Sequence, residues 1–213
     1  KDFYEYGRTL KKDLNLKLTI FCSGQHYEQG NFFIGFCGVK EDLSSKTARL
    51  NAYPLNVKAH LAIYYIIQYI LNPNYLNSSF FDSIKSFFTS FVFKDDFLYL
   101  YEYLNWNENK IENTLKKNYQ WEEYESYGKN QWRMGDGQTA FINYIYFKLA
   151  GFSEFDDFRS KQIRDGLISR KEALELVKQD NQPKYEVLND FANTIGINLE
   201  HVLSRINNIE PIY

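Results

Sequence analysis

Residues that could bind a nucleotide follow the first predicted strand of the chain. The segment Leu16–Cys22 is short and apolar, and Ser23 and Gly24 come directly after it in the stretch FCSGQHYEQG. In open α/β sheets, ligands bind beyond the carboxyl ends of strands, where small residues let backbone N–H groups approach a phosphate or a purine. Neighbouring candidates for cofactor contacts are Gln25, His26 and Glu28. An exposed polar loop explains the same spacing equally well.

A second candidate for anion binding is the turn WRMGDGQT, which leads into an apolar segment from Gln138. A helix N-terminus offers unpaired N–H groups and a partial positive charge, and Arg133 could add a counter-charge for a phosphate or a carboxylate. Gly135 and Gly137 would let the backbone come close to such an anion. The alternative is an ordinary helix start, in which Asp136 caps the N–H groups.

Three basic residues lie within one short predicted helix in the stretch DDFRSKQIRDG, namely Arg159, Lys161 and Arg164. Their spacings spread them over an arc of the helix rather than along one row. Surface charges in contact with water are the simplest interpretation. The functional hypothesis is that Arg159 faces the same cavity as Arg133.

The composition of the chain bounds its partners. With 25 Lys and Arg against 27 Asp and Glu, the 213 residues create no basic field that would attract nucleic acid or an anionic membrane, so neither is an expected partner. The longest apolar run, Leu61–Leu71, is too short to cross a bilayer. Cys22 and Cys37 form neither a CxxC pair nor a zinc site, and we expect buried free thiols in a cytoplasmic protein. No bound metal is expected, and no nucleophile motif identifies a catalytic residue.

Helical patterns cover most of the chain. Predicted helices lie at Phe3–Asp13, Val57–Leu71, Ser79–Phe91, Asn107–Asn118, Gln138–Leu149 and Phe155–Asp165, and a last one carries Leu199 and Ile206. Between these, Ser169 and Glu172 form a capping box that begins a further helix. Pro183 opens the next helix, and Gly196 ends it.

These elements predict a mainly α protein with a small α/β part. A helix followed by the strand at 16–22 is half of an α/β unit, and almost no further units follow, because the chain turns polar through KEDLSSKTARLN and is helical afterwards. We therefore expect residues 1–45 to be the tail of an α/β nucleotide-binding domain and residues 46–213 to be a helical C-terminal domain. Because the sequence starts at Lys1 and its only methionine is Met134, we also expect it to be a piece of a longer protein.

A family resemblance appears in two long stretches, YLNWNENKIENTLKKNYQWEEY and WRMGDGQTAFINYIYFKLAGFSEFDDFRSKQIRDGLISRKEALELV. They resemble the C-terminal region of the N-acetyl sugar amidotransferases, which are PP-loop ATP pyrophosphatases of bacterial lipopolysaccharide and other surface-polysaccharide biosynthesis. The stretch FCSGQHYEQGNFFIGFCGV is similar to the segment after a later sheet strand of that family. The resemblance implies the end of a Rossmann-like PP-loop sheet followed by a helical domain.

The activity implied by this resemblance is an ATP- and Mg²⁺-dependent amidation. The acetamido oxygen of a nucleotide-linked sugar would be adenylated, and ammonia from a separate glutaminase partner would displace AMP. The residues that match the loop bordering the adenylate are Ser23, Gly24, Gln25 and Glu28. The resemblance places nearer to the sugar nucleotide the residues Arg133, Asp136 and Arg159, with Lys161 and Arg164 on the same segment.

The diagnostic Ser-Gly-Gly-x-Asp-Ser pyrophosphate loop of that family does not occur in these residues. We therefore expect this chain to be inactive alone and to bind neither ATP nor Mg²⁺ by itself. The alternative is a non-catalytic helical interaction module that docks a glutaminase or a second copy of itself, and the 18 Tyr and 18 Phe could form such a surface. A third hypothesis is a secreted carbohydrate-binding domain, which a disulfide between Cys22 and Cys37 would favour.

Overall fold

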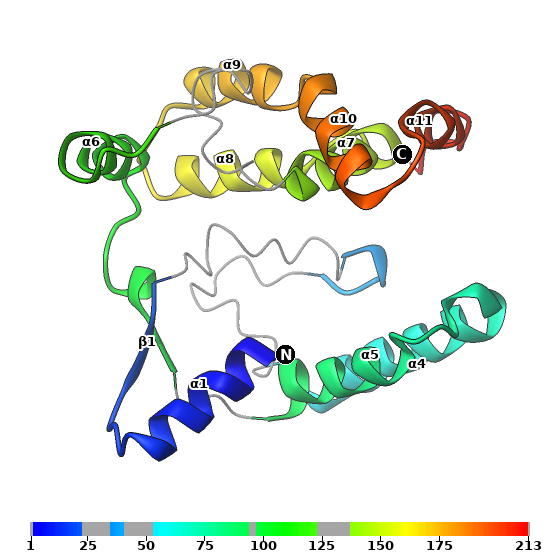
Figure 1. The fold of residues 1–213 in the computed structure, drawn as a ribbon, viewed down its shortest axis with the longest axis horizontal. Helices are drawn as coiled ribbons and strands as arrows, with labels where there is room; N and C mark the ends of the chain where they lie inside the picture. The colour runs from blue at the N-terminus through cyan, green and yellow to red at the C-terminus, as the bar shows by residue number, and fades with distance from the viewer. Residues whose placement is uncertain (1, 23–34, 41–52, 94–96, 123–136, 213) are drawn as a thin grey trace. The chain divides into compact units, whose positions relative to one another are not determined.

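The computed structural model describes residues 2–22, 35–40, 53–93, 97–122 and 137–212 (Figure 1). The chain divides into two compact units, unit 1 (Lys1–Trp106) and unit 2 (Asn107–Tyr213). Helices make up most of the described structure, and one two-stranded parallel sheet accompanies them, which confirms a mainly α fold with a small α/β part. The domain boundary predicted at 45/46 lies among residues 41–52, outside the described part, and stays a prediction.

The sheet of unit 1 is small and pairs segments far apart in the sequence. Helix α1 (Asp2–Asp13) precedes strand β1 (Thr19–Phe21), which pairs in parallel with strand β2 (Phe97–Tyr99). Both the first helix and the first strand were predicted, although the strand is shorter than residues 16–22. The expectation that almost no α/β element follows β1 is wrong in one respect, because β2 supplies a parallel partner.

An aromatic cluster holds this sheet together. Phe21 lies edge-on to Phe97, with ring centroids 4.6 Å apart, and stacks on Tyr99 at 5.8 Å. The guanidinium of Arg8 on α1 lies 5.7 Å from the Phe97 ring centroid. A Cβ atom on Gly7 would lie 3.6 Å from the Phe97 ring, so this glycine lets α1 approach the sheet closely.

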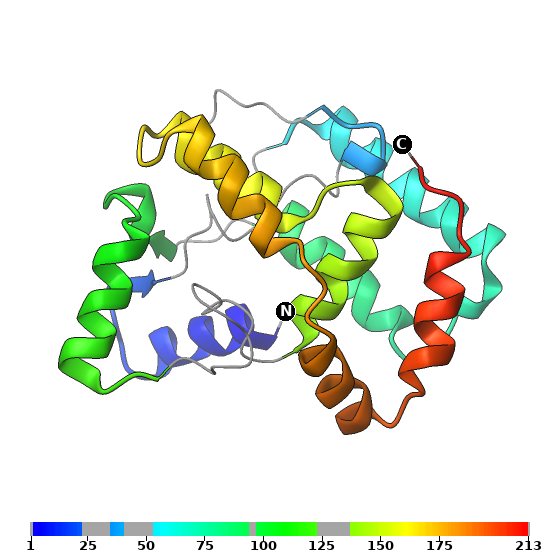
Figure 2. The same cartoon turned by 90° about the horizontal axis from the view of Figure 1, so that it is seen from above.

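The remainder of unit 1 is a helical hairpin. Helix α4 (Leu55–Leu71), the short turn η2 (Pro73–Tyr75), helix α5 (Phe80–Phe87) and the π-helical turn η3 (Phe88–Val92) follow one another, and η4 (Leu100–Glu102) comes after β2. Aromatic contacts hold α4 and α5 side by side, with ring centroids 6.4 Å apart for Tyr65 and Phe87 and 5.0 Å apart for Tyr69 and Phe80 (Figures 1 and 2). Both helices were predicted, and the second one ends in a π-turn that the sequence did not indicate.

Unit 2 is helical throughout its described residues. Its helices are α6 (Glu108–Tyr119), α7 (Gln138–Ala150), α8 (Glu154–Arg164), α9 (Arg170–Asp180), α10 (Tyr185–Ile195) and α11 (Leu199–Asn207). Figure 2 shows α10 and α11 beside α7. The buried core comes from α7, α8, α10 and α11 and consists of Ala140, Tyr144, Phe155, Val187, Leu188 and Ile206. Predicted helices match all six of these elements within a few residues.

Local signals explain where these helices begin and end. The Ser169 hydroxyl accepts a hydrogen bond from the Glu172 backbone N–H, which is one of the two hydrogen bonds of the capping box predicted at the start of α9. Gly196, with φ at 72°, ends α10 in the left-handed conformation. Gly137 begins α7 with φ at 71°, and a Cβ atom there would lie 2.9 Å from the Phe191 Cβ. Glycine is therefore needed at 137 both for its backbone conformation and for its small size.

The described residues bear on three further expectations. No helix among them is both long and apolar enough to span a membrane. No group of three or more His, Cys, Asp or Glu in the described ranges could hold a metal ion.

Cys22 is exposed, which contradicts its predicted burial, and Cys37 is partly buried; the two do not form a disulfide. Burial raises the pKa of the Cys37 thiol.

Candidate functional site

The predicted site residues fall into two groups. Those outside the described part of the chain are Ser23, Gly24, Gln25, Glu28, Arg133 and Asp136. Their predicted contacts with an adenylate or a sugar nucleotide stay predictions, and so does the shared cavity of Arg133 and Arg159. Arg159, Lys161 and Arg164 are described, and all three lie on α8.

Arg159 is the centre of a buried polar cluster that joins α6, α8 and α9. Its Nε donates to Asp180 Oδ2 at 2.9 Å, and its Nη1 donates to Glu108 Oε2 at 2.6 Å. The same Nη1 lies 2.9 Å from Gln162 Oε1, and the Gln162 amide in turn donates to Glu108. Only 3% of the Arg159 side chain is exposed. The interpretation of Arg159 as a solvated surface charge is therefore wrong.

The charges of this cluster stabilise one another. Burial alone acts to lower the pKa of the Arg159 guanidinium, but the carboxylates of Asp180 and Glu108 outweigh that effect and raise the pKa above its ordinary value. Its guanidinium carbon also lies 5.0 Å from the centroid of the Phe158 ring. Because a buried charge is tolerated only when it is paired and hydrogen-bonded, these contacts fix how α6, α8 and α9 pack.

Lys161 and Arg164 occupy different environments from Arg159. The Lys161 side chain is 2% exposed, and its Nζ donates to Asp157 Oδ2 at 2.6 Å, one helical turn earlier. Arg164, in the last turn of α8, is exposed. The interpretation as a solvated charge is thus wrong for Lys161 and right for Arg164. Each of the three cations has its own surroundings, which agrees with the predicted arc.

A second polar cluster fixes the start of α8 against the end of α9. The Ser153 hydroxyl accepts from the Phe155 N–H, and Asp156 Oδ2 accepts from the Ser153 N–H, so the two form a capping box. The Asn181 amide donates to Asp156 Oδ2 at 2.8 Å, and its Oδ1 accepts from the Ser153 hydroxyl. Nearby, Asn143 of α7 exchanges two hydrogen bonds with Glu154, one to its carboxylate and one from its N–H.

A small cavity of about 190 Å³ adjoins both clusters. It is lined by residues of α7 and α8 and of the connection from α9 to α10, among them Asn143, Tyr144, Lys148, Asp180, Asn181 and Lys184. Three amide side chains and one carboxylate thus line a space whose aromatic residues are Tyr144, Phe147 and Phe155. The Lys148 ammonium lies 5.8 Å from the Tyr144 ring centroid. Such a lining can hydrogen-bond a polar ring, and the two lysines can attract an anion.

Sequence reasoning missed most residues of these clusters. Asp180 and Glu108 carry no local signal, because they lie 21 and 51 residues from Arg159 along the chain, whereas Gln162 is only three residues away on the same helix. The capping box was visible as Ser153 with Asp156 three residues later, immediately before the predicted helix. Asn181 also had a local signal, since it directly follows the last residue of α9.

Neither ATP nor Mg²⁺ can be assigned to the described residues. The loop expected to border the adenylate lies within residues 23–34, outside the described part, and the described ranges hold no cluster suited to a metal ion.

Comparison with family models, with curated proteins and with solved structures finds no match for this chain.

Proposed function

We propose that this chain is the C-terminal portion of an ATP-dependent N-acetyl sugar amidotransferase and contributes to the binding of the nucleotide-linked acetamido sugar. The observation that supports the proposal is the cavity between α7, the start of α8 and the connection from α9 to α10, because six of its eleven lining residues, from Ala140 to Phe155, belong to the stretch Trp132–Val177 that resembles the family. The full enzyme would also need ATP, Mg²⁺ and ammonia from a glutaminase, and this chain alone would not catalyse the reaction.

The lining of the cavity suits part of such a substrate. At about 190 Å³ it is smaller than the roughly 300–1,000 Å³ typical of sites for drug-sized ligands, so it would take a sugar ring or an acetamido group rather than a whole sugar nucleotide. Asp180 and the amides of Asn143 and Asn181 offer hydrogen-bonding groups, and Lys148 and Lys184 would face the diphosphate.

In this proposal Arg159 is a positioning residue. Its Nε holds the Asp180 carboxylate, and Asp180 lines the cavity. Direct contact between the sugar nucleotide and Arg133, Asp136, Arg159, Lys161 or Arg164 remains a prediction from the resemblance. For Arg159 and Lys161, such contact would require a carboxylate partner to be displaced, because each is buried against one.

Calorimetry tests this proposal. A UDP-linked acetamido sugar is titrated into the chain, with UDP alone as the reference ligand. We expect binding that weakens at least about 10-fold when Lys148 and Lys184 are both changed to Ala, since the diphosphate loses two counter-charges. Lys178→Ala, on the exposed side of α9, is the matched control and should leave binding unchanged. Absence of binding, or binding indifferent to the Lys148 and Lys184 changes, would contradict the proposal.

The second candidate function is a non-catalytic interaction module that docks a glutaminase or a second copy. The observation that favours it lies in unit 1, where α4 and α5 expose many large apolar side chains. The two candidates are separable, because the docking module needs no sugar nucleotide and the Lys148 and Lys184 changes would leave its association intact.

A further inference from the structure

We infer that the α4–α5 hairpin is a self-association surface, on which a second copy of this chain docks its own α4. The inference rests on the second candidate function, of which it names the partner, and it is independent of the amidotransferase proposal because it concerns unit 1 only. The first observation is how few residues of α4 are buried. Among its 17 residues, all of which are described, only Leu61 is buried. A helix that is apolar on most sides is normally covered on most sides.

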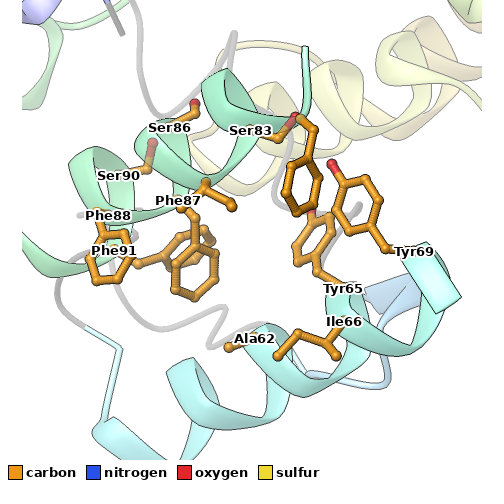
Figure 3. A pocket seen from close by; sticks show the side chains of 12 residues that line it. Ala62, Tyr65, Ile66, Tyr69, Ser83, Ser86, Phe87, Phe88, Ser90 and Phe91 are labelled. Carbon is orange, nitrogen blue, oxygen red and sulfur yellow. The ribbon is translucent and has the colours of Figure 1, made fainter. Parts of the chain in front are cut away.

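One part of this surface is an open groove between the two helices. Its volume is about 550 Å³, and the described residues that line it are apolar or uncharged. Figure 3 shows Tyr65 and Tyr69 of α4 pointing towards α5, with the Phe87 ring opposite them and Ala62 and Ile66 on the floor. The hydroxyls of Ser86 and Ser90 point away from the space. The groove therefore offers an apolar binding surface between α4 and α5.

The other part is an isoleucine ridge on the same helix. Ile63, Ile66, Ile67 and Ile70 recur at positions i, i+3, i+4 and i+7, and they are between 45% and 71% exposed. This is the spacing with which an amphipathic helix fills an apolar groove. Ile66 belongs to the ridge and also lines the groove, so the two features are adjacent.

A ridge on α4 that lies beside the groove between α4 and α5 makes the hairpin surface self-complementary. In a two-fold dimer the same patch meets itself, so the ridge of each copy can enter the groove of the other. Such an interface brings identical residues close together, and a charged patch would repel itself. The ridge carries no charge, and neither do the described groove residues. This lack of charge suits a second copy better than a partner selected by charge.

The size of the surface also fits a dimer. The exposed apolar residues of the hairpin beyond the ridge include Tyr65, Leu71, Phe81, Ile84 and Phe88. Summed over these side chains and the ridge, the exposures amount to roughly 1,000 Å² of accessible surface, and a stable interface takes about 800 Å² from each partner. A small apolar molecule in the groove would leave the ridge uncovered, but a second α4 would cover both.

Sedimentation equilibrium of the full chain, from low to high micromolar concentration, tests the inference. We expect a reversible monomer–dimer equilibrium that Ile66→Glu and Ile70→Glu each weaken at least about 100-fold, because each buries an unpaired carboxylate in the interface. Leu174→Glu on α9 is the matched control, since Leu174 is 52% exposed and lies in unit 2. It should leave the dissociation constant unchanged.

Three results would overturn the inference: a chain that stays monomeric at every concentration, a dimer that both ridge variants leave intact, or a dimer that Leu174→Glu weakens as much as they do. Far-UV circular dichroism checks that each variant keeps its helices. If a glutamate variant loses helicity, the double change Ile63→Ala with Ile67→Ala replaces it, because alanine preserves helix propensity. This double variant should still weaken the dimer at least about 10-fold.

Discussion

In unit 2 a buried arginine contacts two carboxylates and a glutamine, whereas in unit 1 a helix of 17 residues leaves four isoleucines exposed. The units are similar in length and both are largely helical. Four helices of unit 2 pack apolar side chains into a shared core, and the buried cations Arg159 and Lys161 are paired with carboxylates. Unit 1 exposes apolar side chains along both arms of its hairpin.

The two units differ in whether the free-energy cost of their buried polar groups or exposed apolar groups is offset within the unit. Burial of the polar groups in unit 2 costs free energy that their pairing offsets, so these contacts specify one arrangement of α6, α8 and α9. The exposed apolar face of unit 1 costs free energy that nothing within the hairpin offsets. From the same sequence we thus infer a unit whose described helices share a buried core and a unit whose hairpin we expect a second copy to cover.

The largest expected effect comes from breaking the polar cluster of unit 2. Arg159→Ala should lower the free energy of unfolding by about 3–5 kcal/mol, because the buried carboxylates of Asp180 and Glu108 would both lose the guanidinium that they contact. Urea denaturation measures this change. Arg164→Ala, five residues along the same helix and exposed, should alter stability by less than about 0.5 kcal/mol. Equal effects of the two changes would mean that unit 2 does not depend on this cluster.

A smaller effect should come from the packing at the start of α7. Gly137→Ala should cost about 3 kcal/mol, because its φ of 71° strains an L residue and the new Cβ would meet Phe191 at 2.9 Å. Gly151→Ala shares the left-handed backbone, with φ at 75°, but finds nothing within 4 Å, so it should cost about 1 kcal/mol. Thermal unfolding of both variants measures the difference. Similar losses would show that space around residue 137 is not limiting.

Sequence patterns account for much of the fold. Apolar periodicity and caps placed all six helices of unit 2, and Ser169 and Gly196 fixed two of their ends. Strand β2 escaped prediction because Phe97–Tyr99 lies in an aromatic run that suits a strand or a helix. The burial of Arg159 escaped because Asp180 is 21 residues away along the chain and only the packed helices bring the two together. Pairing of charges that are far apart along the chain leaves no local pattern in the sequence from which burial could be predicted.

The smallest expected effect is a pH dependence that differs between the units. Burial, and then the nearby Glu154 carboxylate, raise the pKa of Tyr146 to about 12. From the ordinary value of 10.0 upwards, the unfolded chain therefore loses its phenolic proton first. The stability contributed by protonated Tyr146 is complete below pH 10 and is lost between pH 10 and about 12.

Urea midpoints measured across this range check the effect. Tyr146→Phe in unit 2 should flatten the decline of stability with rising pH. Tyr65→Phe in unit 1 should flatten it less, since burial and the nearby Cys37 raise the pKa of Tyr65 more modestly. Identical slopes for the wild-type chain and Tyr146→Phe would contradict the assignment.

Hydrogen exchange followed by mass spectrometry as a function of protein concentration tests the contrast between the units most directly. We expect amide protection in α4 and α5 to rise as the concentration of the chain increases, because a second copy covers the hairpin. Protection in α7 and α8 should stay constant, since unit 2 completes its own core. Protection of α4 that is independent of concentration, or that changes in step with α7 and α8, would contradict the account.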